Sequence, residues 1–419
     1  MKVQISKGHL RDCEISVISS KSISHRYLIA AALSNGTSVI QNLAVNNDIL
    51  ATINCLKLLG ADITLNDTTA TVRGITDFNE YNGTLIECGE SGSTLRFLIP
   101  LFSLTGKTAH FTGKGRLLKR PMSVYEPLFE EFTNDSNILI VKGSLKPGKY
   151  ILPGDVSSQF ITGLMFALPL LNEDSEITVA EPFNSKSYAD MTVKCLKQFG
   201  ITITSNGSTY YIKGNQKYQP SNVTVESDDS QAAFFGVLAA LNNITVSLTG
   251  ICSNSMQGDH VFTRILTAAG AEVTETETSC LIKGNTLKPL NVSLADCPDL
   301  GPILFALASQ IPGTSLFTDT RRLKDKESDR IMTMKEELEK AGSVVREENN
   351  TVTITGPFVN TNDIIWDSHN DHRVAMALSI LAASQNMPVT ITNAEAVNKS
   401  YPDFYKDLST TGAEVIIYD

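Results

Sequence analysis

Apolar and polar residues follow one recurring order along this chain. An apolar helix ends in a short polar turn, a β-branched strand follows, and a second helix then stops at a glycine before another strand. Residues 238–250 and 258–275 form one clear copy. The strands after the glycines alternate polar and apolar residues, as at 271–275 and 343–347. This alternation is typical of strands with one buried face.

The glycines that end the second helices are regularly spaced. They are Gly60, Gly200, Gly270, Gly342 and Gly412. Neighbouring members lie about 70 residues apart, with one gap of twice that length. A glycine at this point supplies the left-handed cap that ends a helix. The spacing predicts six βαβαββ repeats in a mixed α/β fold. In the second repeat we expect residues 120–132 to supply the second helix, although no glycine closes it.

Six repeats are too many for a single core, so we expect two domains of three repeats each. Polar stretches at residues 16–24 and 218–230 are candidate crossings between them. The prediction is one discontinuous domain, 1–19 plus 227–419, that holds repeats four to six and the N-terminal strand. The inserted domain, 20–226, would hold repeats one to three. Because ligand sites favour domain interfaces, residues near both crossings are the first candidates for function.

Composition excludes several classes of protein. The chain has 419 residues and a formal net charge of −10, which disfavours binding to nucleic acid. No stretch approaches the roughly 20 apolar residues of a membrane span, and residues 1–10 lack the pattern of a secretory signal. Seven cysteines without a CxxC pair indicate reduced thiols and a cytoplasmic protein. Six histidines without metal-ligand spacing predict no metal site.

Basic residues recur in the loop or first turn before a helix. A helix N-terminus with free N–H groups favours anions, so basic loops of corresponding repeats could converge on a cleft for a small polyanionic substrate. Each segment also has a simpler interpretation, as a helix cap or a solvated surface, and 324–330 could form a surface salt-bridge lattice. The segments, some of them short and polar rather than basic, are 20–26, 89–96, 114–122, 157–159, 184–188, 324–330, 371–373 and 398–402.

Several of these motifs in combination resemble the 5-enolpyruvylshikimate-3-phosphate synthase family over essentially the whole chain. The motifs are SKSISHR (20–26), GESGSTLR (89–96), KRPM (119–122), SSQF (157–160), KESDR (326–330), DHRVAM (371–376) and NKSYPDF (398–404). The resemblance implies a two-domain inside-out α/β barrel with three βαβαββ units per domain. It also implies transfer of the enolpyruvyl group of phosphoenolpyruvate to the 5-hydroxyl of shikimate 3-phosphate, with release of phosphate, in the shikimate pathway to chorismate. It implies a monomer that needs no cofactor or metal.

The resemblance also implies roles for individual residues. Those implied in proton transfer are Lys21, Asp299 and Glu327. Those implied in binding shikimate 3-phosphate are Lys21, Ser22, Arg26, Ser157, Ser158, Gln159, Ser185, Asp299 and Lys326. Those implied in binding phosphoenolpyruvate are Lys21, Gly92, Arg120, Gln159, Arg330, Arg373 and Lys399. Arg96 is expected to support the Gly92 loop.

Three positions depart from the family pattern. Glu90 stands where many members have asparagine, Arg322 replaces an asparagine that binds substrate in some members, and Asp229 occupies a position where a small residue is common. The roles of Glu90 and Arg322 are therefore left open. The alternative enzyme is the related transferase acting on UDP-N-acetylglucosamine, which commonly carries a cysteine in the loop that is cysteine-free here at 113–121. A non-catalytic repeat scaffold would explain the repeats but not the basic segments.

Overall fold

The computed structural model describes residues 1–135, 137–358 and 363–418. They form two compact units. The inner-chain unit consists of residues 19–225, and the outer-chain unit consists of residues 1–18 together with the chain from residue 226 onward. In the described part of the chain, each unit contains three four-stranded sheets. The predicted mixed α/β fold is thus confirmed.

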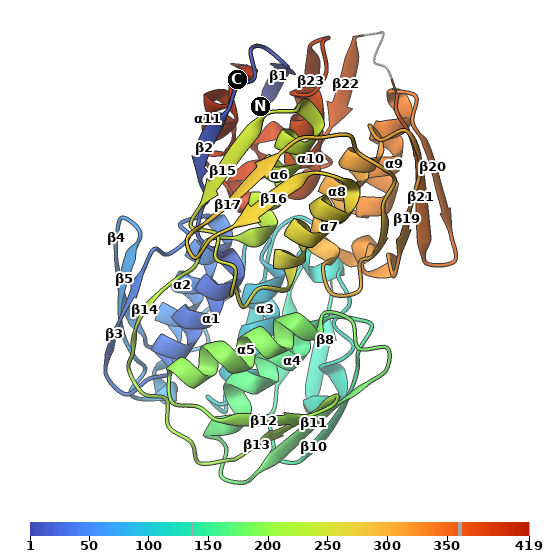
Figure 1. Ribbon diagram of the computed structural model, residues 1–419. Coiled ribbons are helices and arrows are strands. Elements are labelled where there is room, and N and C mark those ends of the chain that lie inside the picture. Colours follow the sequence, from blue (N-terminus) through green and yellow to red (C-terminus); the bar gives the residue numbers. More distant parts are fainter. Residues whose placement is uncertain (136, 359–362, 419) are drawn as a thin grey trace. The chain divides into compact units, whose positions relative to one another are not determined.

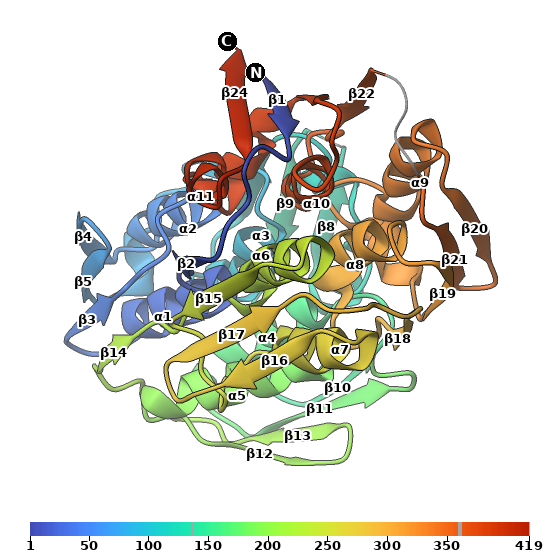
Figure 2. The same ribbon diagram turned by 45° about the horizontal axis from the view of Figure 1, so that its top comes forward.

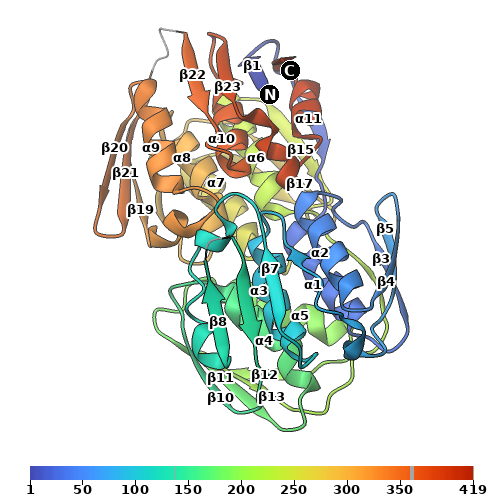
Figure 3. The same cartoon turned by 180° about the vertical axis from the view of Figure 1, so that it is seen from behind.

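In the inner-chain unit the three sheets share one plan. Their strand orders are β14-β3-β5-β4, β6-β7-β9-β8 and β10-β11-β13-β12 (Figure 3). In each, the first two strands are parallel and the following pairs are antiparallel. The strands are β3 (Thr37–Gln41), β4 (Asp62–Asn66), β5 (Thr69–Arg73), β6 (Ile86–Glu87), β7 (Ala109–Thr112), β8 (Glu131–Asn134), β9 (Leu139–Lys142), β10 (Lys149–Pro153), β11 (Ser175–Ala180), β12 (Ile203–Asn206), β13 (Thr209–Ile212) and β14 (Asn222–Thr224). The helices are α1 (Lys21–Ala32), α2 (Asn47–Leu58), α3 (Gly92–Ser103), α4 (Ser158–Ala167) and α5 (Lys186–Gln198).

The outer-chain unit repeats the plan with strands from both ends of the chain. Its sheets are β16-β17-β15-β2, β18-β19-β21-β20 and β22-β23-β1-β24 (Figure 1). The N-terminal strand β1 lies between β23 and β24, and β2 pairs in parallel with β15. The strands are β1 (Lys2–Ser6), β2 (Cys13–Ser16), β15 (Thr245–Thr249), β16 (Glu272–Glu275), β17 (Ser279–Lys283), β18 (Asn291–Ser293), β19 (Gly313–Thr318), β20 (Val344–Glu348), β21 (Thr351–Gly356), β22 (Ile364–Asp367), β23 (Val389–Thr392) and β24 (Glu414–Tyr418). The helices are α6 (Asp229–Asn242), α7 (Phe262–Ala269), α8 (Gly301–Ala308), α9 (Arg330–Lys340), α10 (His372–Ala382) and α11 (Phe404–Thr410).

The helices supply the core, and the sheets cover it. Every residue of α8 and of α10 is buried, and α6, α8 and α10 pack against one another (Figure 2). Helices that are apolar on all sides are stable only in the interior. The outer sheet faces remain solvated, and Ile151 and Ile365 are 79% and 62% exposed. No helix among the described residues combines the length and hydropathy needed to cross a bilayer.

The five helix-ending glycines all adopt the predicted left-handed conformation, with φ between 78° and 112°. The second helix expected at residues 120–132 is wrong. The helical element in this segment is the short 3-10 helix η3 (Glu126–Leu128), which follows η2 (Leu117–Lys119), and strand β8 begins at Glu131. Pro127 would remove a backbone donor from the interior of such a helix. The segment is instead anchored by buried Tyr125, whose hydroxyl lies 2.8 Å from the carbonyl oxygen of Arg96.

Candidate functional site

Three of the cationic side chains predicted to bind substrate surround one carboxylate in the outer-chain unit. The carboxylate is that of Asp299. Lys326 Nζ and Arg330 Nη1 lie 2.8 and 3.1 Å from its Oδ1, and Arg373 Nη2 lies 3.1 Å from its Oδ2. Arg373 also donates to the Asp299 carbonyl oxygen at 3.2 Å. Residues distant in the sequence therefore meet in one cluster.

Glu327 and Asp371 extend this cluster. Glu327 accepts from Arg330 Nη2 at 2.9 Å and forms an ion pair with Lys399 Nζ at 3.3 Å. Asp371 accepts from Arg330 Nε at 2.9 Å and from its Nη2 at 3.2 Å. Arg330 is only 1% exposed and contacts all three carboxylates. Its guanidinium is therefore fixed in orientation before any ligand binds.

Helix starts position these groups. Arg330 is the first residue of α9, and Arg373 lies in the first turn of α10, whose N-cap is Asp371. Asp299 lies on η6 (Pro298–Leu300), directly before α8. Ser230, in the first turn of α6, accepts from Arg373 Nη2 at 3.0 Å. The N-terminal ends of these helices thus gather around the cluster, and their dipoles favour anions there.

Burial and neighbouring charges set the ionisation of the cluster. Burial would raise the pKa of Asp299, but Arg373, Lys326 and Arg330 hold it well below its ordinary value. Burial lowers the pKa of Lys326 to about 8, against the opposing effect of Asp299. Burial would also lower the pKa of Arg330, but Asp371, Glu327 and Asp299 raise it. At neutral pH the cluster therefore holds an ionised Asp299 among cations.

The salt-bridge lattice considered for residues 324–330 does not describe this segment. Arg330 is buried, and the side chains of Lys326 and Glu327 are only 16% and 13% exposed. Lys324 alone behaves as a surface group, with Glu347 as its partner. The alternation of sign therefore reflects inward-facing charges that pair with Asp299, Asp371 and Lys399 from other segments.

In the inner-chain unit, Lys21 and Arg26 lie on α1 and have different environments. Lys21 opens the helix after the N-cap Ser20 and donates to Asp48 Oδ2 at 3.0 Å. Arg26 is 3% exposed, and burial lowers its pKa to about 10, so it remains a cation at neutral pH. It donates to the carbonyl oxygen of Ser22 at 2.7 Å and to Thr192 Oγ1 at 2.9 Å. Arg26 therefore ties α1 to α5.

Gly92 and Arg120 lie in contact at the start of α3. A Cβ atom on Gly92 would fall 2.6 Å from Arg120 Nη1, so any larger residue would force the guanidinium out of its present position. Arg96, one turn along α3, donates to Gln159 Oε1 and to the Pro121 carbonyl oxygen, both at 2.7 Å. Gln159 Nε2 donates to Ser93 Oγ at 3.0 Å. Gly92, Arg120 and Gln159 are thus held together, and Arg96 supports the arrangement.

The three serines predicted to bind phosphate lie at the starts of α4 and α5. Ser157 is the N-cap of α4, and its Oγ accepts from the Gln159 N–H at 3.3 Å. Ser158 is 4% exposed. Ser185 precedes α5, is fully buried, and has φ of 58°, which a non-glycine residue rarely adopts. Ser157 therefore has the capping role considered in the sequence analysis, and its role in substrate binding stays a prediction.

Three polar partners of the predicted residues are not among those that the sequence predicts. They are Asp48 at Lys21, Asp371 at Arg330, and Ser230 at Arg373. Asp371 stands two residues before the predicted Arg373 at a helix start, which is a usable signal, because such an aspartate is a natural N-cap. Asp48 and Ser230 carry no comparable signal, since each meets its partner only through the fold.

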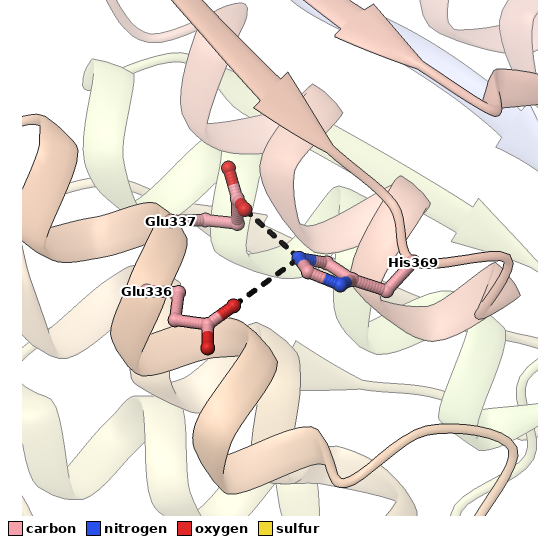
Figure 4. Close-up of side chains that lie close together, drawn as sticks. All are labelled: Glu336, Glu337 and His369. Atoms are coloured by element: carbon pink, nitrogen blue, oxygen red, sulfur yellow. Dashed lines mark hydrogen bonds and ion pairs between the residues drawn. The ribbon is translucent and has the colours of Figure 1, made fainter.

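One group of side chains in the described residues could hold a metal ion by geometry alone. It consists of Glu336, Glu337 and His369 in the outer-chain unit (Figure 4). His369 Nε2 lies 2.9 Å from Glu337 Oε1 and 3.8 Å from Glu336 Oε2. Lys340 Nζ lies 2.6 Å from the other oxygen of Glu337, Oε2. This ammonium group already neutralises the buried carboxylate and would oppose a second cation.

Comparisons with known proteins identify the family of this chain. A family model described as EPSP synthase (3-phosphoshikimate 1-carboxyvinyltransferase) matches residues 6–408. A 3-phosphoshikimate 1-carboxyvinyltransferase of Clostridium kluyveri is 39% identical over 413 residues, which cover 96% of this chain and 95% of the relative. The corresponding protein of Clostridium novyi is 39% identical over 415 residues, 95% of each chain.

Solved structures show the same fold. EPSP synthase from Acinetobacter baumannii superposes with a TM-score of 0.80 at 26% identity, covering 99% of this chain and 100% of that one. The enolpyruvyl transferase NikO from Streptomyces tendae, at 16% identity, has a TM-score of 0.79 with coverages of 99% and 98%, a likeness of fold alone. With the match of the family model, these findings show that the chain belongs to the EPSP synthase (3-phosphoshikimate 1-carboxyvinyltransferase) family.

Proposed function

We propose that this protein transfers the enolpyruvyl group of phosphoenolpyruvate to the 5-hydroxyl of shikimate 3-phosphate and releases phosphate. Family membership over nearly the whole chain supports the reaction. The structural observation that carries the proposal is the Asp299 cluster, in which Lys326, Arg330 and Arg373 surround one ionised carboxylate. Both substrates are polyanions, so fixed cations are the groups that would hold them.

The proposal keeps the residue roles implied by the resemblance. Lys21, Asp299 and Glu327 take part in proton transfer. Shikimate 3-phosphate is bound by Lys21, Ser22, Arg26, Ser157, Ser158, Gln159, Ser185, Asp299 and Lys326. Phosphoenolpyruvate is bound by Lys21, Gly92, Arg120, Gln159, Arg330, Arg373 and Lys399. The division into domains at 19/20 and 226/227 stays part of the proposal.

The chemistry requires an acid, a base and cationic support for a leaving group. The 5-hydroxyl oxygen attacks C2 of phosphoenolpyruvate and loses its proton, while the methylene carbon gains one, which gives a tetrahedral intermediate. The bond from C2 to the phosphate oxygen then breaks, and loss of a methyl proton restores the double bond. Arg373, Lys326 and Arg330 hold the pKa of Asp299 low, which keeps it ionised but makes it a weak base. Asp299 would become a better acceptor for the hydroxyl proton once an anionic substrate binds to these cations.

Arginine and lysine side chains are suited to stabilising the departing phosphate. Phosphate departs with the electron pair of the broken bond, so a fixed cation near it lowers the barrier. Arg330 is held rigidly by three carboxylates, and Lys399 is paired with Glu327. An anionic substrate would compete with Glu327 and Asp299 for these cations. The carboxylates thus keep the cations in place without ligand and become available for proton transfer when substrate binds.

The test is phosphate release from phosphoenolpyruvate by the purified protein. We expect release that depends on added shikimate 3-phosphate and none that depends on UDP-N-acetylglucosamine. Release with UDP-N-acetylglucosamine alone would identify the alternative transferase and overturn the proposal. Parallel measurements on Arg330→Met and Lys326→Met test the assignment of ligands, because the first should raise the KM for phosphoenolpyruvate and the second the KM for shikimate 3-phosphate. The expectation of a cytoplasmic monomer remains a prediction.

A further inference from the structure

We propose that Glu337 and His369 are positioning residues for Arg330, acting through the turn that carries Asp371. The inference rests on the proposed function, in which Arg330 binds phosphoenolpyruvate. All of these residues belong to the outer-chain unit. Helix α9 contains both Arg330 and Glu337, and the turn of residues 368–371 connects Asp367, the last residue of β22, to α10. Glu337 contacts this turn from α9, and His369 lies on the turn. Neither residue has a role in the reaction described above.

Glu337 is a buried carboxylate that fastens this turn to α9. It is 1% exposed, and its Oε1 lies 2.9 Å from His369 Nε2 (Figure 4). A carboxylate can only accept here, so Nε2 carries the hydrogen. The other oxygen, Oε2, accepts from the backbone N–H of Asp367 at 3.0 Å and from Lys340 Nζ at 2.6 Å. Glu337 therefore holds both the backbone that leads into the turn and a side chain on the turn.

The turn itself needs such support. His369 and Asn370 have φ values of 51° and 57°, so two successive non-glycine residues adopt the left-handed conformation. This conformation is uncommon for such residues and persists where surrounding contacts determine it. Within the turn, the Asp371 N–H donates to the Ser368 carbonyl oxygen at 2.9 Å. The bond from His369 to Glu337 ties the turn to α9, and Glu336 of the same helix lies farther from His369 Nε2, at 3.8 Å.

Asp371 links the turn to Arg330, so the position of the turn determines where the Arg330 guanidinium lies. Its side chain is fully buried, and Oδ2 accepts from Arg330 Nε at 2.9 Å and from Ser328 Oγ at 3.1 Å. Helix α9 thus contacts the turn twice, through Arg330 and, about two helical turns later, through Glu337. Because both contacts are made by one rigid helix, loosening the second lets Asp371 shift relative to Arg330. A displaced guanidinium would bind phosphoenolpyruvate less well.

Two substitutions at His369 separate the hydrogen bond from the backbone conformation. Asparagine tolerates the left-handed conformation, but its side chain is too short to reach Glu337. Glutamine is long enough to donate an amide hydrogen to Glu337 Oε1. We expect His369→Asn to raise the KM for phosphoenolpyruvate about fivefold, the scale of one hydrogen bond, with the KM for shikimate 3-phosphate unchanged. His369→Gln should restore most of the wild-type value.

A matched control removes a left-handed residue elsewhere in the same unit. Asn349, between β20 and β21, has φ of 47° and is exposed. Asn349→Ala should lower Tm without changing either KM. If His369→Asn keeps the wild-type KM for phosphoenolpyruvate, or if His369→Asn and His369→Gln raise both KM values in step with their loss of Tm, the inference is overturned.

A second readout does not depend on activity. The Nε–H of Arg330 donates to Asp371, so its ¹⁵N–¹H NMR signal, identified by its loss in Arg330→Lys, reports on this contact. We expect the signal to shift or broaden in His369→Asn and to return in His369→Gln. An unchanged signal in His369→Asn would contradict the inference even if the wild-type protein were inactive with shikimate 3-phosphate. Failure of the proposed function and failure of this inference are therefore distinguishable.

Discussion

Replacing Asp299 with asparagine removes the negative charge that Lys326, Arg330 and Arg373 share. Asparagine keeps the shape of the side chain and one acceptor oxygen. Hydrogen bonds to charged groups contribute about 1.5–3 kcal/mol each, but the Asp299 side chain is 19% exposed, and Arg330 and Arg373 keep other partners. We therefore expect a net loss of about 2 kcal/mol. For a unit of about 200 residues this corresponds to a decrease in Tm of roughly 4–8 °C.

The effect on turnover should be larger than the effect on stability. If Asp299 accepts the hydroxyl proton, Asp299→Asn lowers kcat by about 100-fold or more, because that is the scale of general base catalysis. Affinity for phosphoenolpyruvate should change little, since Arg330 and Arg373 remain. Loss of the neighbouring charge should also lower the pKa of Lys326 below its present value of about 8, because Asp299 is the group that raises it.

The assays are phosphate release for kcat, calorimetric titration for phosphoenolpyruvate binding, and thermal unfolding for Tm. Asp296→Asn is the matched control, because Asp296 is exposed and lies one short turn before Asp299. A kcat for Asp299→Asn within tenfold of the wild-type value would refute the role in proton transfer. Equal Tm values for the two variants would refute the expected loss of about 2 kcal/mol on removal of the Asp299 charge.

Three further predictions concern single groups. Lys326 has a pKa of about 8, below its ordinary value, so the unfolded chain binds more protons than the folded chain between pH 8 and pH 10. The free energy of unfolding of the wild type, measured in urea, should therefore rise over this window relative to that of Lys326→Met. A difference between the two proteins that stays constant with pH would contradict this prediction. Burial lowers the pKa of His25 to about 3, so His25 should lower the free energy of unfolding by about 2 kcal/mol at pH 5 compared with pH 7. His25→Gln should therefore unfold less readily than the wild type on mild acidification, as followed by circular dichroism. Identical pH profiles of the two proteins would show that His25 does not cause the loss of stability in acid. Gly92→Ala places a Cβ against Arg120 and should raise the KM for phosphoenolpyruvate about tenfold with little change in Tm. An unchanged KM would mean that the position of the Arg120 guanidinium does not depend on the space beside Gly92.

The repeats could be predicted because their signals are local. A glycine such as Gly270 ends its helix for conformational reasons that neighbouring residues do not alter. The second repeat could not be predicted in the same way, because the Tyr125 hydroxyl anchors the segment to the distant carbonyl oxygens of Arg96 and Phe160 and a helix does not form. The loops before helices could likewise be predicted as the positions of the basic binding residues, because every helix N-terminus has free N–H groups that favour anions.

Pairing between charged groups was beyond sequence reasoning. Alternation of sign at 324–330 is equally compatible with a solvated surface and with an inward network, and only burial distinguishes them. Asp48 and Asp371 are ordinary first-turn and N-cap residues in the sequence. Their partners Lys21 and Arg330 lie on other helices, so the ion pairs depend on packing that a one-dimensional pattern does not contain.

The position of β1 between β23 and β24 has a consequence for biosynthesis. All strands of the inner-chain unit are outside the ribosome once β14 has emerged from it, so that unit can fold while translation continues. Strand β1 is synthesised before β23 and β24, so it must wait for both before its sheet is complete. During that interval both edges of β1 are unpaired, which exposes this strand to non-native pairing and to binding by chaperones.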